Sequence, residues 1–119
     1  MRIVCFLMGG LFALAPATAF AESFSVDSEC CGALYYHVGP GGSVRGEYPK
    51  QDGRIFGTVG PEGAATGIWT QPRSDHPCVR PRNGSFAWGR FVIRNIGTPD
   101  ISGEWGYCDE YPNRGWGFR

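Results

Sequence analysis

The sequence predicts a small all-β protein stapled by disulfide bonds. Its 119 residues include 19 Gly and nine Pro, and in a helix interior each Gly costs about 1 kcal/mol and each Pro about 3 relative to Ala. Short runs of aromatic and β-branched residues between the glycines have the composition of strands. Short strands separated by turn signals predict an antiparallel meander that forms a barrel or a sandwich.

Eight segments are expected to form strands. They are residues 23–26, 34–38, 46–48, 54–59, 67–71, 85–96, 102–108 and 115–118. The linkers between them are rich in turn residues, with the hairpin signals Asp-Gly at 52–53 and Asn-Gly at 83–84. The tripeptide Gly-x-Trp recurs at residues 67–69 and 103–105.

For the hairpin made by the sixth and seventh expected strands, the sequence also predicts the register of pairing. We expect its turn at residues 98–100. The pairs that then face each other are Phe91 with Tyr107, Ile93 with Trp105, and Arg94 with Glu104. This register gives one apolar face and a cross-strand ion pair on the other face, as the alternation of a strand demands. The first four of these residues are therefore expected in the core.

Residues 1–21 have the features of a cleavable secretory signal peptide. Arg2 supplies a positive charge, residues 3–15 form an uncharged apolar run, and residues 19–21 are a small-x-small cleavage site. A membrane-spanning helix is the alternative, but it needs about 20 apolar residues and this run is shorter. We expect cleavage after Ala21 and one mature β domain of residues 22–119, secreted or periplasmic, with no membrane span.

Four cysteines remain in the mature chain: Cys30, Cys31, Cys78 and Cys108. An even number in a small exported domain predicts two disulfide bonds. We expect Cys78 to pair with Cys108, because each lies next to an expected strand in the aromatic-rich half. The state of Cys30 and Cys31 stays open between a bridge joining the two neighbours, free thiols, and a crossed pattern with the other two cysteines.

The balance of charge excludes one class of partner. The chain has 11 basic and 11 acidic residues, and loss of Arg2 leaves a net charge of about −1. A nearly neutral chain lacks the positive field that attracts nucleic acid. No cofactor-binding motif is present in the sequence, so no cofactor is expected.

Four residues are candidate ligand contacts: Trp88, Arg90, Arg80 and His76. Trp88 and Arg90 are expected on the outer face of the sixth strand, where an exposed Trp beside Arg is a typical interface anchor. Arg80 and His76 belong to segment 72–82, the longest expected loop. Its three prolines and bridged cysteine make it stiff, and stiffness lowers the entropy cost of binding. The other tryptophans, Trp69, Trp105 and Trp116, are expected in the core.

Catalytic and metal-binding signals are weak. Asp75, His76 and Glu110 are the side chains that an enzyme would use, but no nucleophile motif accompanies them. A zinc site would need a second ligand cluster at a suitable spacing from His76. We therefore predict neither catalytic residues nor a metal.

The expected function is that of an exported, non-enzymatic binding module. Its partner is expected to be a glycan, or an envelope or extracellular protein such as a hydrolase that it inhibits. A small secreted hydrolase-type enzyme and a structural envelope protein are the alternatives.

Overall fold

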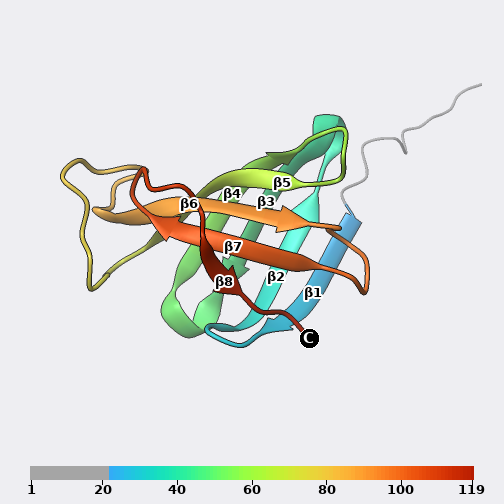
Figure 1. The fold of residues 1–119 in the computed structure, drawn as a ribbon, viewed down its shortest axis with the longest axis horizontal. Helices are drawn as coiled ribbons and strands as arrows, with labels where there is room; N and C mark the ends of the chain where they lie inside the picture. The colour runs from blue at the N-terminus through green and yellow to red at the C-terminus, as the bar shows by residue number, and fades with distance from the viewer. Residues whose placement is uncertain (1–21) are drawn as a thin grey trace, which may run out of the picture.

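The all-β prediction is confirmed by a computed structural model, which describes residues 22–119 (Figure 1). The strands are β1 (Glu22–Ser28), β2 (Gly32–Val38), β3 (Ser43–Tyr48), β4 (Gly53–Val59), β5 (Ala65–Gln71), β6 (Ala87–Arg94), β7 (Ser102–Tyr107) and β8 (Arg114–Trp116). Two single 3₁₀ turns, η2 (Pro40–Gly42) and η3 (Pro49–Gln51), join β2 to β3 and β3 to β4. Each strand overlaps one of the eight expected segments. The predicted signal peptide, residues 1–21, lies outside the described residues.

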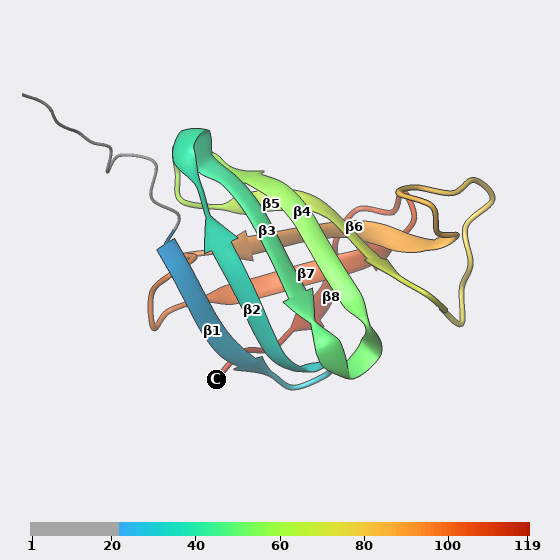
Figure 2. The ribbon, with the colours of Figure 1, turned by 180° about the vertical axis from the view of Figure 1, so that it is seen from behind.

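The eight strands form one sheet in which every strand pairs antiparallel with its neighbour along the chain. The sheet curls into a half-barrel, so that β5 to β8 lie across β1 to β4 (Figures 1 and 2). Its two ends meet, because the Glu29 amide donates to the Gly117 carbonyl and the Arg119 amide donates to the Asp27 carbonyl, both at 2.9 Å. The fold is therefore one curled sheet rather than a two-sheet sandwich. No helix of residues 22–119 is long and apolar enough to cross a bilayer.

The core fills the concave side of this sheet. Alternate residues of the strands face it, as the period of two requires. The largest fully buried side chains are Phe91, Leu34, Ile55, Ile93 and Val44. Aromatic side chains from β3, β5, β7 and β8 extend this core toward one end of the half-barrel.

The β6–β7 hairpin keeps its predicted faces but not its predicted register. Phe91 lies opposite Trp105, and Ile93 lies opposite Gly103, a shift of two residues. The cause is a connection of two successive turns centred on Thr98, whose amide donates to the Asn95 carbonyl at 3.1 Å. A shift of two preserves the inward face, so Phe91 and Ile93 are buried while Trp105 and Tyr107 are partly buried. Arg94 still forms its ion pair with Glu104, now along a diagonal.

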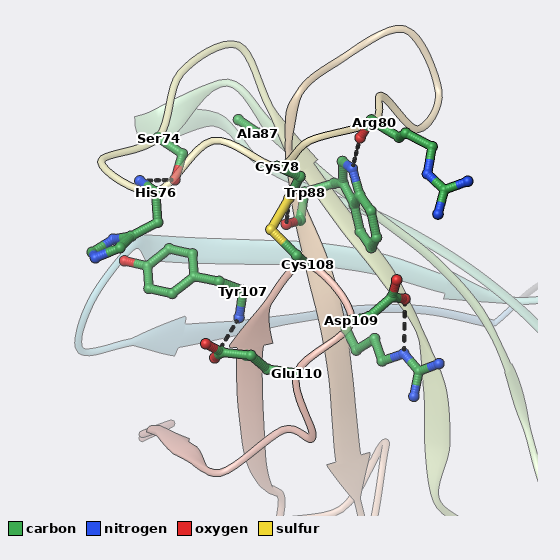
Figure 3. The surroundings of a disulfide bond; sticks show 12 residues. Ser74, His76, Cys78, Arg80, Ala87, Trp88, Tyr107, Cys108, Asp109 and Glu110 are labelled. Atoms are coloured by element: carbon green, nitrogen blue, oxygen red, sulfur yellow. Dashed lines mark hydrogen bonds and ion pairs between the residues drawn. A yellow bond between two sulfur atoms is a disulfide. The ribbon is translucent and has the colours of Figure 1, made fainter.

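The predicted Cys78–Cys108 disulfide is present, and its cysteines lie 30 residues apart. Cys30 and Cys31 are joined to each other, which selects the neighbour bridge among the alternatives left open by the sequence. The bridge from Cys78 to Cys108 closes a long loop and is worth about 3 to 4 kcal/mol by the chain-entropy argument. It attaches the β5–β6 loop to the end of β7 (Figure 3).

Glycines let neighbouring backbones approach closely where the sheet curls. Gly57 and Gly67 lie opposite each other on β4 and β5. A Cβ added at Gly67 would collide with the Phe56 carbonyl, and one added at Gly89 would collide with the Gly106 carbonyl and the Trp69 indole. The high glycine content thus has a packing cause in addition to its role in turns.

Replacing Gly67 by Ala is expected to lower the free energy of unfolding by about 2 kcal/mol or more, because the backbone carbonyl next to it cannot move aside. Urea unfolding followed by tryptophan fluorescence measures the change. Gly115→Ala is the matched control, since a Cβ at that strand position meets no atom within 4 Å. Equal stability of the two variants would contradict the proposed close approach.

Candidate functional site

The four candidate contact residues do not form one site. Trp88 and Arg80 lie on one side of the Cys78–Cys108 bridge, and His76 lies on the other side against Tyr107 (Figure 3). Arg90 is exposed on the outer face of β6 and pairs with Asp109 at 3.9 Å. Both partners are largely exposed, so this pair adds little to stability.

Trp88 lies on the outer face as predicted, but the expectation that it is exposed was wrong. Its side chain is only 4% exposed, because the β5–β6 loop folds back over it. The indole Nε1 donates to the Arg80 carbonyl at 2.7 Å, and the Arg82 guanidinium lies 4.8 Å from the ring centroid. The Cys78 amide donates to the Phe86 carbonyl at 2.7 Å, which fixes the loop further. Trp88 is therefore the anchor of the loop rather than an open platform.

The residues that an enzyme would use make mainly structural contacts. The Ser74 hydroxyl accepts the backbone amide of His76 at 3.0 Å, and a Glu110 carboxylate oxygen accepts the Tyr107 amide at 3.3 Å. The His76 ring lies against the Tyr107 ring, with centroids 4.4 Å apart. Within residues 22–119 there is no group of three or more His, Cys, Asp or Glu side chains that could hold a metal ion.

A cavity of about 650 Å³ opens at the end of the half-barrel where the β1–β2 turn, η3 and the first residues of the β5–β6 loop come together. Five aromatic residues form its inner wall: Tyr48, Trp69, Trp105, Tyr107 and Trp116. Its rim includes the polar side chains Lys50, Asp52, Gln71, Arg73 and Asp75, and the bridged cysteines Cys30 and Cys31. A volume of this size is typical of small-molecule sites, which range from about 300 to 1,000 Å³.

The aromatic wall is held by edge-to-face contacts. Trp105 meets Trp69 with centroids 5.9 Å apart and planes at 83°, and it meets Tyr107 at 4.9 Å and 85°. Trp69 also donates its indole N–H to the Gly106 carbonyl at 3.0 Å. These geometries are the favoured ones for aromatic pairs. The wall is therefore a fixed surface, and Trp105 and Tyr107, which are only partly buried, are its accessible members.

Charged groups from β8 and the loop before it border this wall. The Arg114 guanidinium lies 5.6 Å from the Trp105 centroid and 5.0 Å from the Tyr107 centroid. It also pairs with Glu110 at 3.8 Å. Both members of this pair are about half exposed, so the pair adds little to stability.

Two polar groups of the inner wall differ in their hydrogen bonding. The Tyr48 hydroxyl donates to Gln71 Oε1 at 3.0 Å, and its burial raises the pKa of Tyr48 well above the ordinary tyrosine value. The Trp116 Nε1 is buried and has no hydrogen-bond partner among the described residues. Burial also raises the pKa of Tyr36, on the opposite side of the core.

Comparison with models of protein families, with curated proteins and with solved structures finds no match.

The sequence predicted that the three wall tryptophans lie in the core; Trp69 and Trp116 are buried there, and Trp105 is partly buried against it. The prediction missed that they line a cavity. The recurring Gly-x-Trp was the available signal, because it places Trp69 and Trp105 on the same inward face of β5 and β7, where they touch. Nothing local in the sequence brings the β1–β2 turn to them.

Trp88→Ala is expected to lower the free energy of unfolding by about 3 to 5 kcal/mol, because it empties a closed site under the loop. Trp88→Phe keeps most of the packing but loses the hydrogen bond to the Arg80 carbonyl, which should lower the free energy of unfolding by about 1 kcal/mol. Urea unfolding measures both changes. Phe86→Ala is the control, since Phe86 is 52% exposed two residues away. A fully stable Trp88→Ala protein would mean that the loop does not depend on this ring.

Alkaline pH is expected to destabilise the protein through Tyr48. The folded state holds this phenol neutral, with a pKa above that of the unfolded chain, which is about 10. The unfolded state then releases its proton first, so the stability present below about pH 10 falls as the pH rises further. Urea midpoints between about pH 8 and 11 should decline less for Tyr48→Phe than for wild type. Tyr111→Phe, at a 78% exposed position, should decline as wild type does.

Proposed function

We propose that the protein is an exported binding module that holds a neutral sugar ring in the cavity at the open end of the half-barrel. The observation that carries this proposal is the combination of a fixed aromatic wall and a polar rim around one opening. The predicted signal peptide and the two disulfide bonds support an exported protein, because such bonds persist in oxidising compartments.

The chemistry of the cavity suits a carbohydrate. A sugar ring has an apolar face made of C–H groups and an edge of hydroxyls. Trp105 offers a flat apolar surface to such a face, whereas Tyr107, which lies against the His76 ring, supports Trp105 from the side. Gln71, Arg73 and Asp75 supply donors and acceptors at the rim for the hydroxyls. Few polar groups placed around an apolar wall are the usual arrangement of a small-molecule site.

The charges of the rim favour a neutral ligand. Lys50 and Arg73 are balanced by Asp52 and Asp75 among the lining residues. No single sign dominates the opening, so neither an anionic nor a cationic ligand gains from the field. A neutral glycan needs only the hydrogen bonds and the aromatic contact.

The loop between β5 and β6 supports a second candidate, a protein partner such as a hydrolase that the module inhibits. Val79 in this loop is 95% exposed, while its neighbours are fixed through the Cys78 bridge and the Arg80 carbonyl. A rigid loop that presents an apolar side chain suits a protein contact. Val79 does not line the cavity, so the two candidates are tested by different variants.

The proposed function predicts that mature protein binds neutral tetrasaccharides, measured by calorimetry with cellotetraose, chitotetraose and mannotetraose as probes. Trp105→Ala should weaken binding by about tenfold or more, the equivalent of about 1.4 kcal/mol of lost ring contact. Arg73→Ala, at an exposed rim position, should weaken binding without changing stability.

Tyr35→Ala is the matched control, because this half-exposed aromatic lies on the outer face of β2 away from the cavity. It should bind as wild type does. Binding that is lost with Val79→Ala but kept in Trp105→Ala would move the site to the loop and contradict the cavity proposal.

A further inference from the structure

We infer that the Cys30–Cys31 disulfide is itself part of the binding surface, and that it packs against the apolar face of a pyranose whose hydroxyls are all equatorial. This inference rests on the proposed sugar-binding function and names its ligand class. Both cysteines line the cavity together with Trp105 and Tyr107. Cys30 is exposed, whereas Cys31 is only 8% exposed.

The bridge contributes little to stability as a crosslink. The entropy lost by the unfolded chain on crosslinking grows with the length of the closed loop. Cys78 and Cys108 are separated by 30 residues, but Cys30 and Cys31 are separated by one. The neighbour bridge therefore acts mainly on the local shape and surface of the β1–β2 turn.

That turn is held in place before any ligand binds. The Ser28 hydroxyl accepts the Cys31 amide at 3.2 Å and donates to the Gly32 carbonyl at 2.9 Å. Gly32 has a φ of 70°, a conformation that glycine adopts without strain. Ser28 also pairs with Phe118, which ties the turn to the C-terminal segment. The disulfide is thus a preorganised part of the cavity rim, which lowers the entropy cost of binding.

The surface that the bridge presents is apolar and polarisable. Two bonded sulfurs carry no N–H or O–H donor and accept hydrogen bonds only weakly. Sulfur does make favourable contacts with flat, apolar or aromatic groups. A hydroxyl directed at it would lose its hydration without gaining a strong partner, at a cost of about 1 to 3 kcal/mol.

The same restriction applies to the aromatic part of the wall. A ring that contacts either surface by its face must direct C–H groups at it and keep its hydroxyls at the edge. Pyranoses with only equatorial substituents, as in β-linked glucose and N-acetylglucosamine, meet this condition. Mannose and galactose each place one axial hydroxyl over one face, so only their other face meets it.

The test is the rate at which dithiothreitol reduces each disulfide of the wild-type mature protein, followed by alkylation and mass spectrometry. Saturating cellotetraose should slow reduction of Cys30–Cys31 by about tenfold, because the ring covers the sulfurs. The Cys78–Cys108 bridge, whose cysteines do not line the cavity, is an internal control and should react at an unchanged rate. Mannotetraose should bind more weakly and protect less.

A double variant tests whether the disulfide itself contacts the sugar. Cys30→Ala with Cys31→Ala should keep the thermal midpoint close to that of wild type and weaken cellotetraose binding by about tenfold. If cellotetraose binds and Trp105→Ala weakens it, yet neither the reduction rate nor the double variant responds, the disulfide inference is wrong and the proposed function stands. If none of the three tetrasaccharides binds wild type, both are wrong.

Discussion

The close approach of backbones across the glycines of β4, β5 and β6 is the constraint on which the rest of the structure depends. A sheet of eight strands with ordinary side chains at Gly57, Gly67 and Gly89 would have to open, because each added Cβ would collide with a neighbouring carbonyl. With glycine there, β5 to β8 can lie across β1 to β4 and enclose a core (Figure 2). The curl also brings the two ends of the sheet together at Ser28 and Phe118. The open end, and hence the cavity, follows from this curl.

The two disulfides serve different needs of a small domain. The Cys78–Cys108 bridge fastens a long loop to the sheet, and the loop in turn buries Trp88 on the outer face. A domain of this size has a small hydrophobic core, so burial of Trp88 under the loop adds to the apolar surface that the inner core buries. The Cys30–Cys31 bridge closes no loop of consequence and shapes one turn at the cavity. One disulfide thus contributes mainly to stability, and the other mainly to the shape of the cavity.

Much of the fold could be predicted from the sequence because its signals are local. Glycine spacing and alternating aromatic residues located all eight strands, and the alternation around Phe91 and Ile93 identified the inward face of β6. The predicted register of the β6–β7 hairpin was wrong because its connection contains two successive hydrogen-bonded turns around Thr98, which residue types alone do not specify. The prediction that Trp88 is exposed was wrong because the β5–β6 loop folds back over the strand. Such a long-range contact leaves no pattern in the spacing of residues. The cavity is lined by residues from five separate segments, so no single stretch of the sequence predicts it.

The aromatic residues of the inner wall explain why this end of the core is open. Rigid rings in edge-to-face contact, such as Trp69 with Trp105, cannot collapse onto one another as flexible aliphatic chains do. Space therefore remains beside them, bordered by polar side chains of the rim. Trp116 belongs to the same wall and leaves its buried N–H without a partner among the described residues, at a cost of about 1 to 3 kcal/mol. An unsatisfied donor and an unfilled cavity at one place are a local departure from close packing. Such departures from the rules of stability are characteristic of functional sites.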